Sequence, residues 1–114
     1  MKKIEAIVKP EKVRAVLSTL KEVGVTGITV VSARGQGSGA RPLIRDSKGM
    51  PLHTAEYNTM NSVITIVNDS MVDTVMTAIA KVAVSGSKGN GKVFVFPVDE
   101  VMDLETGRRS SNFV

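Results

Sequence analysis

The sequence predicts a single α+β domain in which an antiparallel sheet carries two helices on one face. Strand-like stretches alternate with amphipathic helical stretches along 114 residues, a length that suits one domain. Hydrophobic residues make up 42% of the chain, which is enough for a folded core. No apolar run in the sequence is long enough to cross a membrane as a helix, so we expect no membrane insertion.

The first half of the chain has the pattern of a strand, a helix and a second strand. Residues 2–9 alternate apolar and polar side chains, as a half-buried strand does. Pro10 suits the first turn of a helix, apolar residues follow at helical spacing, and Gly24 suits the position after a helix end. Residues 26–34 are rich in β-branched side chains, which predicts another strand.

The second half has the same order of elements. Residues 63–67 form a short apolar run, which predicts a strand that is buried on both faces. Asp69 or Ser70 is expected to cap the helix that follows. Residues 93–96 predict the last strand, and the polar segment 99–114 follows it as a tail.

This order is that of the ferredoxin-like βαββαβ sandwich, in which both helices cover one face of an antiparallel sheet. The other face of the sheet would stay open. At least some of four apolar side chains would lie on it: Ile7, Val31, Ile64 and Ile66. An open apolar face needs a partner, so the sequence predicts an oligomer.

Composition argues against several kinds of site. The chain has no cysteine, which excludes disulfides and thiolate metal sites, and its one histidine, His53, lies in a loop-like stretch. We therefore expect no metal centre and no enzyme activity. The net charge of +4 favours anionic partners, but scattered charge serves solubility equally well. One tyrosine and three phenylalanines are too few to predict a nucleic-acid surface.

Two glycine-rich segments, residues 35–39 and 89–92, could bind phosphate. Glycines let backbone N–H groups approach a phosphate, and the lysine at the end of the second segment adds positive charge. Neither segment has Walker or Rossmann spacing. The Asn90–Gly91 pair would equally suit a tight hairpin turn.

The segment from residue 36 to about 59 has no periodicity and is punctuated by glycine and proline. Loops of this length in small domains are usually functional or mobile. Its polar composition fits a segment that folds on a protein partner, although a variable loop without a role remains an alternative.

Three blocks in order, MKKIEAIVKP, GVTGITVVSARGQG and GNGKVFVFPV, resemble the PII signal-transduction family, as does Thr106–Gly107 near the end. The resemblance covers residues 1–37 and roughly 60–107, and it breaks only at the long loop. It implies one PII-like domain over residues 1–114, with a T-loop at about 36–59, a B-loop at about 85–92 and a C-terminal segment at 99–114.

Members of this family are trimers that bind ATP or ADP between subunits and control a target protein through the T-loop. The resemblance therefore implies a cytoplasmic homotrimeric regulator with a nucleotide as effector. Its target would be a transporter, an ABC ATPase or a metabolic enzyme, and it would bind no nucleic acid. The altered loop makes a PotN-like subclass, acting on a polyamine or other ABC importer, one candidate.

Carried over to this sequence, the family's adenine contacts would be Ile7, Thr29 and Ile66. The phosphate contacts would be Gly35, Gln36, Gly37, Gly89, Asn90, Gly91 and Lys92. The alternative to nucleotide contact is a purely structural role for each of these residues, in the core, at a subunit interface, as a loop hinge or at a solvated position. Tyr57 follows Ala-Glu, as does the family's modified tyrosine, and is a candidate for uridylylation.

Some positions depart from the family. Residues 38–39 are Ser-Gly instead of Arg-Gln, so the glutamine that helps to hold magnesium and 2-oxoglutarate is missing. Asp103 and Glu105 replace two arginines that reach the neighbouring subunit's nucleotide, and their charge would repel a polyphosphate unless a metal intervenes. Arg108 and Arg109 could compensate or belong to a basic tail. We expect ADP or AMP to compete well with ATP, or low affinity, and no 2-oxoglutarate sensing; the role of magnesium stays open.

Two other functions are compatible with the same scaffold. The fold by itself does not exclude a small enzyme, although the sequence has no cysteine and no paired-carboxylate motif. A nucleic-acid-binding module is the other alternative, and the scarcity of aromatic residues on the predicted strands argues against it.

Overall fold

A computed structural model describes residues 1–37, 43–44, 53–54, 57–86 and 91–112. Its elements follow one another in this order: β1 (Lys2–Val8), η1 (Pro10–Lys12), α1 (Val13–Glu22), β2 (Thr29–Gly35), β3 (Leu43–Ile44), β4 (His53–Thr54), β5 (Asn58–Val67), η2 (Asp69–Met71), α2 (Val72–Ala83), β6 (Gly91–Pro97), β7 (Val101–Met102) and β8 (Arg109–Ser110).

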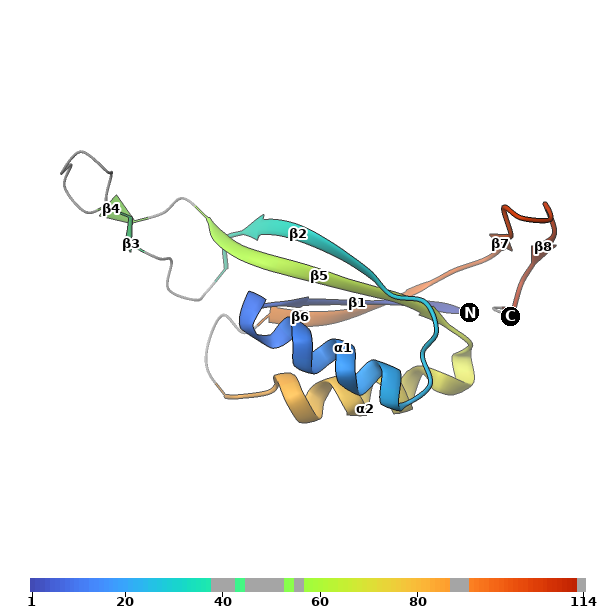
Figure 1. The fold of residues 1–114 in the computed structure, drawn as a ribbon, viewed down its shortest axis with the longest axis horizontal. Helices are drawn as coiled ribbons and strands as arrows, with labels where there is room; N and C mark the ends of the chain where they lie inside the picture. Colours follow the sequence, from blue (N-terminus) through green and yellow to red (C-terminus); the bar gives the residue numbers. More distant parts are fainter. Residues whose placement is uncertain (38–42, 45–52, 55–56, 87–90, 113–114) are drawn as a thin grey trace.

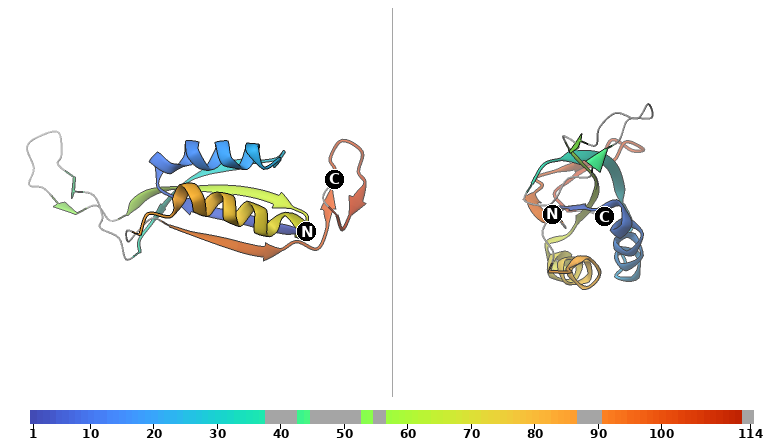
Figure 2. Two further views of the ribbon diagram at one scale, coloured as in Figure 1. Left: turned by 90° about the horizontal axis from the view of Figure 1, so that it is seen from below. Right: turned by 90° about the vertical axis from the view of Figure 1, so that its left-hand side faces the viewer.

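Four strands form the main sheet in the order β2-β5-β1-β6, and every neighbouring pair is antiparallel. Helices α1 and α2 lie side by side on one face of this sheet (Figures 1 and 2). This arrangement confirms the predicted ferredoxin-like βαββαβ fold. No helix among the described residues is long and apolar enough to span a bilayer.

The core lies between the sheet and the helices. Alternate residues of β1 point toward the helices, so the predicted half-buried strand is confirmed. The buried apolar residues from both halves of the chain meet there, and they are Ile4, Ala6, Val8, Val16, Leu20, Val25, Val63, Val67, Val75 and Ile79. Burial of these side chains is the main force that holds the helices on the sheet.

Helix α1 ends where the sequence predicts. Gly24 has a φ of +91°, a conformation that glycine adopts easily. The amide of Val25 donates to the carbonyl of Leu20 at 3.0 Å, and the amide of Gly24 donates to that of Lys21 at 3.1 Å. These two bonds form a Schellman motif, which satisfies carbonyls that a helix end leaves unpaired.

Strand β5 differs from its prediction in length and in burial. It begins at Asn58 instead of residue 63, because its first half pairs with β2 as far as Gly35. It is also not buried on both faces. Val63 and Val67 are buried under the helices, whereas Ile64 and Ile66 are only half-buried on the opposite face.

Strand β2 begins at Thr29, three residues later than predicted. The carbonyl of Gly27 accepts a hydrogen bond from the Thr65 hydroxyl at 2.7 Å, and this bond holds the connection from α1 beside the sheet. A side chain, not a strand amide, therefore satisfies this carbonyl, and pairing with β5 starts only at Thr29.

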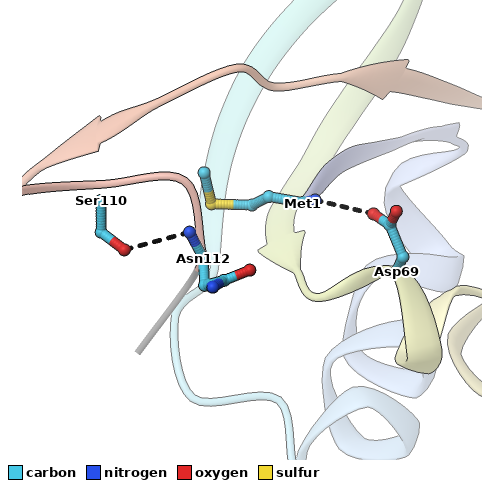
Figure 3. A network of polar contacts seen from close by, with 4 residues as sticks. All are labelled: Met1, Asp69, Ser110 and Asn112. Atoms are coloured by element: carbon cyan, nitrogen blue, oxygen red, sulfur yellow. Dashed lines mark hydrogen bonds and ion pairs between the residues drawn. The ribbon is translucent and has the colours of Figure 1, made fainter.

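The predicted side-chain cap of α2 is wrong. Residues Asp69–Met71 form a 3₁₀ turn, and neither this turn nor α2 has a side-chain hydrogen bond from its N-cap residue. The Asp69 carboxylate instead accepts a hydrogen bond from the amino group of Met1 at 2.7 Å (Figure 3). This bond lowers the pKa of the Asp69 carboxyl below its usual value.

The predicted polar tail contains a hairpin. β7 pairs with β8, and the amide of Asp103 donates to the carbonyl of Arg108 at 2.9 Å across the turn. Gly107 has a φ of +74°, so a glycine suits this turn. The hairpin projects from the end of the sheet that is opposite to β3 and β4 (Figures 1 and 2).

Part of the predicted loop 36–59 lies in strands. β3 pairs with β4 inside it, and residues 58–59 belong to β5. The last strand of the main sheet, β6, is longer than predicted and begins at Gly91, so Gly91 and Lys92 are strand residues. Residues 87–90, which include predicted contacts Gly89 and Asn90, lie outside the described residues.

Candidate functional site

Strand register locates the predicted adenine contacts on the face of the sheet away from the helices. Ile7 is paired with Ser62 on one side and Lys92 on the other, and Thr29 is paired with Ile64. Directly paired residues point to the same side of a sheet. We call this surface the open sheet face; its residues are Lys3, Glu5, Ile7, Thr29, Val31, Ala33, Met60, Ser62, Ile64, Ile66, Lys92, Phe94 and Phe96.

The open sheet face is largely apolar and confirms the predicted positions of Ile7, Val31, Ile64 and Ile66. Its outer parts are well exposed: Val31 is 46% exposed on the edge strand β2, and Phe94 is 42% exposed on the edge strand β6. An exposed apolar surface on this scale is typical of a protein interface.

One subunit does not bring the predicted nucleotide contacts together. Ile66 is paired with Lys3, which is four positions before Ile7 on β1, so Ile7 and Ile66 are about 13 Å apart along the strands. Lys92 is paired with Ile7, whereas Thr29 is level with Glu5, two positions from Ile7 and two from Lys3 along the strands. The predicted contacts are therefore spread along the sheet and do not gather at one point of a single subunit.

Gly91 controls how closely β6 approaches β1. Its φ is +101°, and a Cβ atom added to it would lie 1.6 Å from the carbonyl oxygen of Ile7. Only glycine can occupy this position without a shift of the backbone. The close approach sets the pairing of Gly91 with Val8 and of Lys92 with Ile7. The sequence interpretation assigned Gly91 to a turn and missed this role.

Gly35 and Gly37, unlike Gly91, lie where the surrounding atoms leave room for a side chain. Gly35 ends β2 opposite Asn58, and Gln36 and Gly37 follow it as exposed residues. Neither glycine has a positive φ, and a Cβ atom added to either would meet no atom within 4 Å. No neighbouring atom in the described subunit therefore requires glycine at either position.

A polar network that sequence reasoning missed lies on the open sheet face. The Ser62 hydroxyl donates to Glu5 Oε2 at 2.5 Å, and Lys3 Nζ lies 3.6 Å from Glu5 Oε1. Lys3 Nζ is also 5.0 Å from the centre of the Phe96 ring, within the range of a cation–π contact. The alternation of β1 contains the signal, because it puts Lys3 and Glu5 on the face of Ile7.

Tyr57 stands directly before β5, and its ring is 43% exposed. The guanidinium carbon of Arg34, near the end of β2, lies 6.0 Å from the ring centre. This contact joins the two strands on either side of the long loop. Tyr57 is therefore accessible to a modifying enzyme, and its modification stays a prediction.

Two residues of the C-terminal segment that the sequence analysis singled out, Asp103 and Arg109, have local partners. Asp103 Oδ1 accepts a hydrogen bond from the amide of Glu105 at 2.8 Å, which holds Asp103 in the turn. The guanidinium of Arg109 pairs with Glu100, and this bond raises the pKa of Arg109. Within one subunit the hairpin lies at the end of the sheet opposite to β3 and β4 (Figure 1).

Two hollows in the described part of the subunit lie away from the predicted adenine contacts. A mainly apolar pocket of about 320 Å³ separates the end of α2 from the start of β6, and Met76, Ala83 and Lys92 contribute to its walls. A shallower hollow of about 500 Å³ lies between α1 and α2. Ile7, Thr29 and Ile66 line neither of them. Among the described residues, no group of acidic or histidine side chains is arranged to hold a metal ion.

Comparison with known proteins points to one family. The family model described as nitrogen regulatory protein P-II matches residues 1–108. The chain is 37% identical over 116 residues to the nitrogen regulatory protein P-II of Azospirillum brasilense, with all of both chains covered. It is 38% identical over 109 residues to nitrogen regulatory protein P-II 1 of Escherichia coli K12, with 94% of each chain covered.

Proposed function

The chain belongs to the nitrogen regulatory protein P-II family of signal-transduction regulators, and we propose that it binds ATP or ADP between the subunits of a homotrimer. In this proposal the nucleotide state governs how the long loop, residues 36–59, contacts a target protein. The target is a transporter, an ABC ATPase or a metabolic enzyme. The protein acts in the cytoplasm by contact and not by catalysis, and it binds no nucleic acid.

The separation of the predicted contacts carries this proposal. An adenine ring is much smaller than the distance of about 13 Å between Ile7 and Ile66 along one sheet. A cleft between subunits removes this difficulty, because Ile7 of one copy can face Thr29 and Ile66 of another. The apolar open sheet face supports such an assembly, since it would otherwise remain in water.

The phosphates belong at the Ile7 end in this proposal. Lys92 is exposed there beside Ile7 and supplies a positive charge. An added Cβ at Gly35 or Gly37 would meet no atom within 4 Å, so the described subunit leaves space beside these glycines for a phosphate to approach.

The position of the hairpin and its negatively charged carboxylates support the proposal that the protein discriminates only weakly among nucleotides. The hairpin projects from the end of the sheet opposite to β3 and β4 (Figure 1), and in this proposal its carboxylates lie near a phosphate that is bound on a neighbouring copy. Asp103 is held in the turn by the amide of Glu105, and its charge cannot easily move away. We therefore propose that ADP or AMP competes well with ATP and that 2-oxoglutarate is not sensed. A magnesium ion would reduce the repulsion if it binds with the phosphates.

Titration calorimetry of the purified protein with ATP, ADP and AMP tests this proposal, each with and without magnesium and 2-oxoglutarate. We expect micromolar binding of a nucleotide to each chain. Substitution Lys92→Met should weaken binding by about tenfold or more, because it removes a charge-assisted phosphate contact. Lys81→Met, which removes an exposed lysine of α2, is the matched control and should leave affinity unchanged.

Three outcomes would contradict the proposal. Absence of binding by all three nucleotides would remove the nucleotide site. Equal affinities for the wild type and Lys92→Met would show that the phosphates bind elsewhere. Magnesium-dependent ATP binding that 2-oxoglutarate strengthens would overturn the expected ligand choice.

Tyr57 is proposed as a site of uridylylation, because its ring is exposed beside the long loop. Incubation with a uridylyltransferase and UTP, followed by intact-mass measurement, should show the added group. Tyr57→Phe is the control, and an equal mass increase in that variant would assign the modification to another residue.

A further inference from the structure

The polar network Lys3–Glu5–Ser62 lies on the open sheet face, which is largely apolar. Its neighbours across the strands are Ile64, Ile66, Phe94 and Phe96. Both carboxylate oxygens of Glu5 have a partner, since Ser62 binds one at 2.5 Å and Lys3 lies 3.6 Å from the other. The three side chains therefore already contact one another within a single subunit.

Covering the open sheet face would bury these charges. Ser62 is already only 5% exposed, and the side chains of Glu5 and Lys3 retain 22% and 36% exposure. A buried charge is tolerated only while its partners stay in place, whereas apolar side chains pack in many arrangements. A partner in the wrong register would remove water from Lys3 and Glu5 without replacing its hydrogen bonds.

We propose that the Lys3–Glu5–Ser62 network selects other copies of this chain as partners and restricts them to one register and one number of subunits. The inference rests on the trimer proposed above. The network carries one cation and one anion side by side, so it is complementary to a second copy of itself. A single buried polar residue has this effect in coiled coils, where it sets register and subunit number at some loss of stability.

Native mass spectrometry and sedimentation over a range of protein concentrations test this inference on four proteins. They are the wild type, Glu5→Gln, the apolar triple variant Lys3→Met/Glu5→Leu/Ser62→Ala, and Glu22→Gln as the control. Glu22 is an exposed carboxylate on α1, away from the open sheet face.

We expect one oligomeric species from the wild type and from Glu22→Gln. Glu5→Gln leaves the Lys3 charge without its anion, so the concentration at which half of the subunits dissociate should rise by about tenfold or more. The apolar triple variant should still associate, but as a mixture of subunit numbers. Circular dichroism establishes that each variant is folded, and the triple variant tests the inference even if Glu5→Gln does not fold.

A triple variant that forms the same single species as the wild type would overturn the inference, and so would unchanged dissociation of a folded Glu5→Gln. In both cases the proposed trimer would stand. A monomeric wild type at all concentrations would overturn the trimer and this inference together, and nucleotide titration of that monomer would show whether the proposed nucleotide site also fails.

Discussion

Replacing Gly91 by alanine would put a methyl carbon 1.6 Å from the carbonyl oxygen of Ile7. Two terms add to the loss of stability. A residue with a side chain at a φ of +101° is strained by about 1–3 kcal/mol. Relief of the overlap requires movement of strand backbone, which costs about another 1–3 kcal/mol. We therefore expect Gly91→Ala to lower the free energy of unfolding by about 2–6 kcal/mol, a large part of the stability of a typical domain.

Urea denaturation followed by circular dichroism measures this loss, at one protein concentration because assembly would add to apparent stability. Gly37→Ala is the matched control. Gly37 has no positive φ and no atom within 4 Å of an added Cβ, so its free energy of unfolding should change by less than about 0.5 kcal/mol or rise slightly. Equal denaturation midpoints for the two variants would refute the close approach of β6 to β1.

Two further predictions concern contacts seen in the fold. Thr65→Val removes the 2.7 Å hydrogen bond to the Gly27 carbonyl and should lower the free energy of unfolding by about 1–3 kcal/mol, as measured by urea denaturation; an unchanged midpoint would mean that water replaces the bond. The amino group of Met1 lowers the pKa of the Asp69 carboxyl below 3.8, its usual value. The contact between Met1 and Asp69 therefore stabilises the fold above pH 3.8, and this stabilisation is lost as the pH falls through the lowered pKa. The stability difference between the wild type and Asp69→Asn should therefore shrink in acid, and a difference that is constant from neutral pH to below the lowered pKa would contradict this.

Much of the fold follows from local patterns. The alternation of Ile4, Ala6 and Val8 marks the face of β1 that meets the helices, and Gly24 marks the end of α1. The spacing of apolar residues indicates which side of an element faces the core, and it can be read within each segment without reference to the others. Element order then leads to the ferredoxin-like arrangement without knowledge of any contact.

Element bounds were harder to predict, because they depend on a partner strand. β5 extends back to Asn58 because β2 continues to Gly35, and β2 starts late because Thr65 binds the carbonyl before it. The hairpin of β7 and β8 was missed for a similar reason, since its polar residues have no alternation and its turn is closed by Asp103.

For the candidate site, the sequence by itself determined which residue types are available: a lysine at position 92, glycines at 35 and 37, and apolar residues at 7 and 66. Only the tertiary structure decided their arrangement. Register separates Ile7 from Ile66, brings Ser62 to Glu5, and makes glycine necessary at position 91. Residues far apart in the chain meet in these contacts, and a local pattern carries no information about such distances.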